Sequence, residues 1–336
     1  MSSGKVFIAV DALGADDAPS VVLDGVKQAL EQDKSLNILL CGPKDVVESF
    51  SNGVDRCEPV VCTQEIAMDE HPAMAIRKKK DSTIVVGCKY VKDGKADGFY
   101  SAGNTGACLA AATLVTGRIK GVLRPMLATN IPTSENGKST LLCDLGANAD
   151  CKPENLLQFG IMASSYIKAV KKIKKPKIGL LNIGEEDSKG SQLAQEAHVL
   201  MNDKLNDFKG NAEGRDIMNG KFDAVVTDGF TGNVVLKSME GTLKMTFWLL
   251  KATFMSSLKS KIGALLVKGN IKNMVKDLDP ESIGAALLFG VKGACCVGHG
   301  NSSSRAICNG ILNTAEFARN KVPDKIEVEI KKVGIK

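Results

Sequence analysis

Several signals that assign a protein to a large class are missing from this sequence. No apolar run approaches the roughly 18 residues that a membrane-spanning helix needs, and the segment Met1–Lys5 lacks the regions of a secretory signal. Three scattered histidines without an HExxH motif do not supply a zinc site with ordinary ligand spacing. One Trp and three Tyr offer few rings for base stacking, and the net charge of +6 is modest. We therefore expect a cytoplasmic protein that binds no metal and no nucleic acid.

Nucleotide and nucleophile motifs are missing as well. The sequence contains neither GxGxxG nor GxSxG. Gly137-Lys-Ser139 is similar to the end of a Walker A loop, but Pro132 occupies the required earlier glycine position and a strand pattern follows instead of a helix. The ten cysteines lie mostly singly in apolar stretches without a CxxC pair, so we expect reduced core residues. No cofactor is expected.

The pattern that is present is an alternation of buried strands and helices. Short apolar runs are followed by helical periodicity, for example after Pro19 and after Pro153. This alternation predicts an α/β fold with a doubly wound, mostly parallel sheet, and the lack of linkers or repeats predicts one α/β domain over residues 1–336. The expected strands are Val6–Val10, Ile38–Cys41, Phe99–Ser101, Leu127–Ile131, Leu141–Leu145, Ile178–Ile183, Ala224–Thr227 and Ala294–Val297.

The two kinds of connection differ in chemistry. Helix-to-strand returns are plain and rich in Lys, whereas strand-to-helix turns are rich in Gly, Asn, Asp and Ser. In open α/β sheets, ligands bind outside the carboxyl ends of the strands, so we expect these turns to meet at one edge and form the site. The turns are Asp11–Asp17, Ser101–Gly106, Asp144–Asp150, Asn182–Lys189, Asp228–Asn233 and His299–Arg305.

The turn Ser101-Ala-Gly-Asn-Thr-Gly106 is the clearest candidate for anion binding. It ends a strand and begins an Ala-rich helix, so free backbone N–H groups and the helix dipole face the crevice. The alternative is an ordinary helix cap by Ser101, Asn104 or Thr105, with glycines that serve the turn. The two interpretations are equal for this turn alone, and the five similar turns favour anion binding.

Three other turns carry charged or polar candidates. Lys189 follows three acids and is a candidate phosphate ligand, although an acid-capped, solvated helix start explains the loop equally well. Asn233 is a candidate donor and Asp228 a candidate partner for a cation or water, against an ordinary turn. His299 is the only histidine in one of these turns, because His71 and His198 are interpreted as surface residues.

One segment is strongly basic. Residues 241–276 contain seven Lys and no acid, with Leu243, Phe247, Leu250 and Phe254 at helical spacing. We expect a basic amphipathic helical segment over residues 241–280 that projects from the domain and contacts a membrane surface, an acidic partner or both. The alternative is a core or dimer-packing helix whose lysines face water. The expected surface residues are Phe247, Trp248, Phe254, Lys251, Lys259 and Lys261.

Taken together, these motifs resemble the phosphate acyltransferase family of bacterial phospholipid synthesis over nearly the whole chain. The resemblance is carried by Ala9-Val-Asp-Ala-Leu-Gly14, Ala75–Ser82, Ser101–Gly106, Asp144-Leu-Gly-Ala-Asn148, Leu181–Gly190, Gly232–Lys237 and His299-Gly. The pattern departs mildly at Ala15 and Asp16, where relatives often carry Gly and Asp, and at Asn301, which interrupts the usual His-Gly-Ser-Ser.

The resemblance implies a reaction, a fold and partners. A long-chain acyl thioester on acyl carrier protein reacts with inorganic phosphate to give acyl phosphate, which passes to a glycerol-3-phosphate acyltransferase of the membrane. The implied fold is similar to isocitrate and isopropylmalate dehydrogenases and to phosphotransacetylase. Members are homodimers in the cytoplasm, often loosely associated with membrane. A short-chain acyl-CoA:phosphate transferase is the nearest alternative, because it does not require the basic segment.

Phosphate is already a nucleophile and a thiolate leaves readily, so the protein must mainly orient reactants and stabilise an oxyanion. We expect Ser101, Asn104, Thr105, Gly106 and Lys189 to hold phosphate and Asn233 or His299 to donate to the carbonyl oxygen. Asp228 is a further expected catalytic residue, and the remaining expected substrate contacts are Asp11, Gly14, Gly103, Asn148, Ser302 and Arg305.

Overall fold

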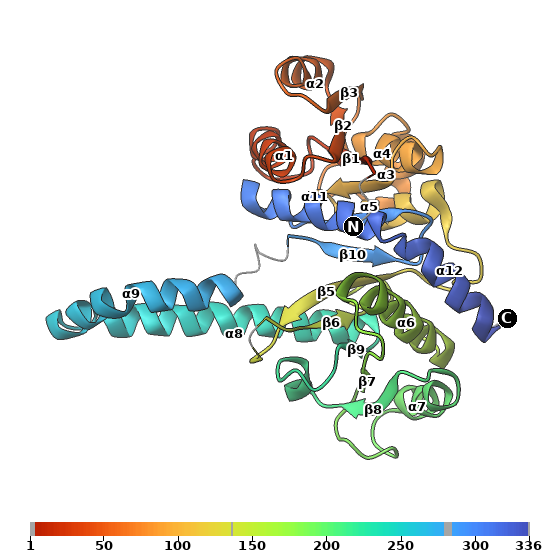
Figure 1. Ribbon diagram of the computed structural model, residues 1–336, viewed down its shortest axis with the longest axis vertical. Coiled ribbons are helices and arrows are strands. Elements are labelled where there is room, and N and C mark those ends of the chain that lie inside the picture. Colours follow the sequence, from red (N-terminus) through yellow and green to blue (C-terminus); the bar gives the residue numbers. More distant parts are fainter. Residues whose placement is uncertain (1–3, 136, 279–283, 335–336) are drawn as a thin grey trace.

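A computed structural model describes residues 4–135, 137–278 and 284–334, and its centre is one eleven-stranded sheet in the order β3-β2-β1-β4-β11-β10-β5-β6-β9-β7-β8 (Figure 1). Five parallel strands form one half: β1 (Val6–Asp11), β2 (Leu36–Gly42), β3 (Cys57–Val61), β4 (Gly98–Ser101) and β11 (Ala294–Val297). Four parallel strands form the other: β6 (Ser139–Cys143), β7 (Ile178–Leu181), β8 (Phe208–Ala212) and β9 (Ala224–Val226). Between them lie β5 (Met126–Pro132) and β10 (Ala286–Phe289).

Helices cover both faces of this sheet, as a doubly wound fold requires. Alternate residues of β1 belong to different cores, with Ile8 and Val10 in one and Ala9 in the other. The first core includes α1 (Ser20–Gln32), α6 (Pro153–Tyr166), α7 (Gln192–Lys204), α11 (Ser304–Arg319) and α12 (Val322–Val333). The second includes α3 (Pro72–Lys78), α4 (Thr83–Lys92) and α5 (Thr105–Ala111). The predicted α/β fold class is confirmed.

The remaining elements are short, except for two long helices. The short ones are α2 (Lys44–Ser51), the π-helical turns η1 (Ala112–Gly117) and η2 (Ile167–Lys171), and the 3-10 helix η3 (Gly214–Ile217). The long ones are α8 (Gly229–Met255) and α9 (Leu258–Leu278), which lie against each other and extend away from the sheet as a helical hairpin (Figure 1). None of the helices, within the part of the chain described, combines the length and apolar character needed to cross a membrane.

The hairpin exposes a large amount of apolar side chain. Trp248 is 65% exposed and Leu266 82%, whereas Phe247 and Phe254 are only partly exposed. Lys251, Lys259 and Lys261 are exposed, in keeping with a basic surface. Phe247 and Phe254 were expected at the surface, but both are partly covered. A helix that packs on a neighbour buries one of its own apolar stripes.

The expectation that all six turns meet at one edge is wrong. β10 is antiparallel to β11 and β5, and β5 is antiparallel to β6, so three reversals separate the two halves of the sheet. The carboxyl ends of β1, β4 and β11 therefore lie on one edge of the sheet and those of β6, β7 and β9 on the other. Alternation of strands and helices in a sequence does not report this reversal.

Candidate active site

A pocket of about 560 Å³ opens where the turns after β1, β4 and β11 meet. It is lined by the backbone and side chains of Asp16, Met68, Gly103, Asn104, Thr105, Gly106, His299, Gly300 and Asn301. The backbone N–H of Asp16 donates to the Gly300 carbonyl at 2.8 Å, which joins two of the turns directly. Three of the six predicted turns thus form one concave site.

Ser101 shapes this site from below. It is fully buried, its hydroxyl donates to an Asp11 carboxylate oxygen at 2.8 Å, and it accepts from the Gly103 N–H at 3.0 Å. A side chain on Gly14 would lie 2.6 Å from this hydroxyl and 2.7 Å from Asp11, so glycine is needed there. Burial raises the pKa of Asp11, and the hydrogen bond from Ser101 opposes that rise. Ser101, Asp11 and Gly14 therefore support the turn, and the hydroxyl is already engaged.

Asn104 is likewise engaged within the protein. Its side-chain oxygen accepts from the Ala107 N–H and caps α5. Its amide nitrogen donates to the carbonyls of Ala67, Met68 and Glu70 at 3.0 to 3.1 Å. The Asn104 side chain thus fixes the loop 65–71 to the turn, and its expected phosphate contact would have to come from the backbone.

The groups left to meet a ligand are on Thr105, Gly106 and His299. N–H groups in the first turn of a helix have no acceptor within the helix and attract anions. Thr105 and His299 are exposed and line the pocket. Ser302 instead stabilises the next turn, since its hydroxyl accepts from the His299 N–H at 3.2 Å, and Arg305 lies exposed in the first turn of α11.

On the opposite edge, Asp228, Asn148 and Asn233 gather around the start of α8. Asp228 caps α8 and accepts from the Thr231 N–H and hydroxyl at 2.9 and 2.8 Å. The Asn148 amide is buried and donates to Pro125 and to Asp144. Asn233 is exposed. The side chains of Asp228 and Asn148 therefore brace this loop, and Asn233 is the one that faces solvent.

Lys189 belongs to the loop between β7 and α7, and the prediction that the nearby His198 lies on the surface is wrong. His198 is 6% exposed instead of lying on the surface. Its ring nitrogens lie 3.0 Å from the Asn211 side-chain oxygen and 3.2 Å from the Asp187 carboxylate, so it holds this loop in place. Lys189 itself is exposed. A single histidine in a helical pattern carries no signal for such contacts.

The two groups of turns follow strands that are widely separated in the sheet. β7 stands six positions from β4 in the strand order. Neighbouring strands are about 4.8 Å apart, so Lys189 and Ser101 follow strands separated by about 29 Å. Asn233 follows β9, five positions away. The strand order therefore does not place Lys189 or Asn233 next to Ser101–Gly106.

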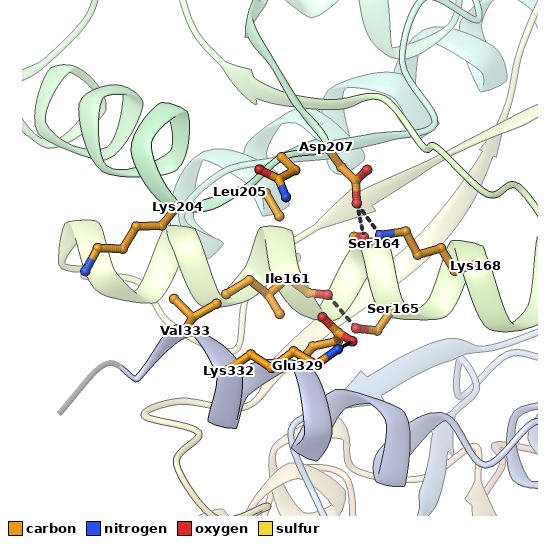
Figure 2. Close-up of a pocket in the computed structure, with 11 residues that line it drawn as sticks. Ile161, Ser164, Ser165, Lys168, Lys204, Leu205, Asp207, Glu329, Lys332 and Val333 are labelled. Atoms are coloured by element: carbon orange, nitrogen blue, oxygen red, sulfur yellow. Dashed lines mark hydrogen bonds and ion pairs between the residues drawn. The ribbon is translucent and has the colours of Figure 1, made fainter.

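Two other features of the described residues gather polar side chains. Three carboxylates of Glu185, Glu213 and Asp216 lie within 4.8 Å of one another, and Lys221 pairs with two of them. Arg215 pairs with Glu213 as well, so basic side chains already neutralise the carboxylate cluster. A second pocket of about 400 Å³ lies between α6 and α12 (Figure 2). Several of its polar groups pair with one another, since Asp207 accepts from Ser164 and Lys168 and Glu329 pairs with Lys332.

Four pocket residues were not predicted from the sequence: Asp16, Met68, Gly300 and Asn301. Asp16 and the 300–301 pair lie in turns that the sequence had identified, so their position next to Thr105 follows from strand order alone. Met68 lies in a loop without a local motif, and only the contact from Asn104 reveals it.

Comparison with known proteins places the chain in a family. The model of a family described as "Fatty acid synthesis protein" matches residues 6–325. The phosphate acyltransferase of Alkaliphilus oremlandii is 44% identical over 331 residues, covering 97% of this chain and 98% of that protein. The phosphate acyltransferase of Lysinibacillus sphaericus is 42% identical over 328 residues, covering 98% and 99%.

Solved structures share the fold at low identity. The EutD phosphotransacetylase from Staphylococcus aureus has a TM-score of 0.61 at 15% identity and 94% coverage of both chains. A phosphotransacetylase from Streptococcus pyogenes has a TM-score of 0.60 at 17% identity and the same coverage. The fold is thus that of the phosphotransacetylases, as expected, and the full-length sequence matches show that the chain belongs to the phosphate acyltransferase family.

Proposed function

We propose that this protein transfers an acyl group from a thioester to inorganic phosphate, giving acyl phosphate and a free thiol. The observation that carries the proposal is the pocket in which the first turn of α5 meets His299, in a chain of this family. The donor in this proposal is a long-chain acyl group on acyl carrier protein. No cofactor takes part, because phosphate supplies the nucleophile.

The pocket residues have separate tasks in this reaction. A phosphate oxygen attacks the carbonyl carbon, the C–S bond breaks, and the thiolate leaves and takes up a proton from solvent. The N–H groups of Thr105 and Gly106 hold phosphate, and His299 donates to the carbonyl oxygen while negative charge develops on it. Positioning lowers the barrier by about 7 to 11 kcal/mol, and one oxyanion donor adds about 3 to 4.

The helical hairpin supports a location at the membrane surface. Its exposed apolar residues, with Lys251, Lys259 and Lys261 beside them, suit an anionic lipid surface or the acidic carrier protein. The acyl phosphate would then pass to a glycerol-3-phosphate acyltransferase of the membrane. We further propose a cytoplasmic homodimer that associates peripherally.

A donor comparison tests the proposed reaction. Thiol release is followed with palmitoyl carrier protein, palmitoyl-CoA and acetyl-CoA, each with and without phosphate. We expect phosphate-dependent release that is most efficient with the carrier protein. A preference for acetyl-CoA would favour the alternative of a short-chain acyl-CoA:phosphate transferase, and release that ignores phosphate would contradict both.

A further inference from the structure

Met68 occupies an unusual position in the pocket. Of the other described residues that line the pocket, three are glycines and the rest are polar: Asp16, Asn104, Thr105, His299 and Asn301. Met68 therefore supplies the apolar side chain of an otherwise polar site. It is 48% exposed, and its methyl group would lie 2.6 Å from a side chain on Gly300, so it reaches across to the turn after β11.

The loop that carries Met68 is built to hold it there. The Asn104 amide donates to the carbonyls on both sides of this position, as described above, and to the Met68 carbonyl itself at 3.0 Å. The Glu70 carboxylate accepts from the Ala67 N–H at 2.8 Å and pairs with Lys79 at 2.5 Å. The Lys79 ammonium also donates to the Glu65 carbonyl at 2.8 Å. These contacts connect the two ends of the loop 65–71 and join the loop to the turn Ser101–Gly106.

Residues of the segment Ala75–Ser82 also stabilise this loop. The segment is one of the motifs of the family resemblance, and none of its residues lines the pocket. Lys79 and Asp81 both hold the loop, since Asp81 accepts from the Thr63 N–H and hydroxyl at 2.9 and 2.5 Å. The N–H of Thr83 donates to the Gln64 carbonyl at 3.3 Å. The segment Ala75–Ser82 thereby holds the loop that carries Met68 in place through Lys79 and Asp81.

We propose that Met68 is a donor-binding residue that contacts the thioester arm of the acyl donor beside the phosphate site. This inference rests on the proposed function. The arm next to a thioester sulfur is a chain of methylene and amide groups, common to carrier-protein and CoA donors. A thioether side chain is flexible and polarizable, which suits contact with sulfur and methylene groups. Phosphate does not interact favourably with such a side chain, so the two substrates separate on the two sides of the pocket.

Met68→Ala tests this proposal, because it should change the KM for the acyl donor and leave the KM for phosphate unchanged. We expect the KM for palmitoyl carrier protein and for palmitoyl-CoA to rise by about fivefold, the effect of losing one to two methylene-sized contacts, with the KM for phosphate unchanged. Met68→Leu conserves volume and should restore the donor KM. Met68→Gln, of similar length but polar, should behave like the Ala variant.

Met74→Ala is the matched control, because Met74 is 52% exposed on α3 and does not line the pocket. Its constants should equal those of the wild type. Equal donor KM values in the Met68→Ala and Met74→Ala enzymes would overturn the role of Met68, as would a parallel rise for phosphate. A wild-type enzyme without phosphate-dependent activity would instead refute the proposed function. A rise with palmitoyl carrier protein alone would place Met68 at a protein surface and contradict contact with the shared arm.

Discussion

Lys171 ends η2, and its ammonium lies against the first residue of β6. It donates to the Ser139 carbonyl at 2.8 Å and to the Ser139 hydroxyl at 2.9 Å. Burial lowers its pKa from 10.5 to about 8, with the charge of Asp223 opposing that shift. An amine whose pKa is lower in the folded state destabilises the fold while both states are charged, because folding then buries the full charge.

The sign of the resulting pH dependence follows from proton counts. Below pH 8 both states hold the proton, so the whole cost of burial is present. Between about pH 8 and 10.5 the unfolded chain holds more protons than the folded one, so the free energy of unfolding rises with pH. Lys171→Met should therefore gain up to about 3 kcal/mol over the wild type at pH 7, and this gain should shrink at pH 10.

Urea denaturation at both pH values measures this difference. Lys174→Met provides the control, because Lys174 is exposed and its replacement should give the same small change at each pH. A Lys171→Met advantage that is equal at pH 7 and pH 10 would show that the ammonium stays charged in the folded protein.

Single residues of the site were predictable from sequence only where the signal is local. Thr105, Gly106 and His299 line the pocket because they follow β4 and β11, which are parallel neighbours and therefore end at the same edge of the sheet. The engagement of Asn104 with residues 67–70 depends on a loop more than 30 positions earlier. His198 was misjudged for the same reason, since its partners lie on a loop and on β8.

The helical hairpin allows a test at the scale of an element. Trp248 is the only Trp of the chain and is 65% exposed on α8, so its fluorescence reports on the hairpin alone. We expect a blue shift with phosphatidylglycerol vesicles. Trp248→Ser should weaken vesicle binding by about 2 kcal/mol, the value of one large apolar side chain, without changing turnover of a carrier-bound donor.

Trp248→Phe keeps an apolar ring and serves as the control, with sedimentation of vesicles as the measurement. Equal sedimentation of the Ser and Phe variants would show that this face of the hairpin does not enter the lipid. If instead turnover falls with the Ser variant while vesicle binding is unchanged, the hairpin serves the carrier protein.

Whole elements were predicted well where apolar runs are continuous. All eight expected strands occur, because strands buried on both faces read as unbroken apolar runs. β3 and β8 were missed because they are the edge strands, and half of their residues are polar or exposed. β10 was missed although its four apolar residues form a run as long as those of β4 and β11. β10 also supplies the reversals that separate the two halves of the sheet, so missing it led to the wrong expectation of a single edge.

At the scale of the whole molecule, the separation of the two groups of turns bears on whether one chain or two chains form a complete site. His299 lines the pocket, while Lys189 follows a strand about 29 Å across the sheet from β4. From the sequence, both residues are expected to act in one reaction, Lys189 on phosphate and His299 on the carbonyl oxygen. Because the two residues follow distant strands within one chain, we propose that in a homodimer the Lys189 loop of one copy completes the pocket of the other.

Mixing two inactive variants tests this arrangement. We expect His299→Ala and Lys189→Ala each to lose most activity, because one lacks the oxyanion donor and the other a cation for phosphate. Unfolding and refolding a 1:1 mixture makes half of the dimers mixed, and each mixed dimer has one site with both residues intact. About a quarter of the wild-type activity should therefore return. Wild-type phosphate kinetics in Lys189→Ala would remove Lys189 from the reaction, and two inactive variants without recovery would place its task within its own chain, away from the phosphate.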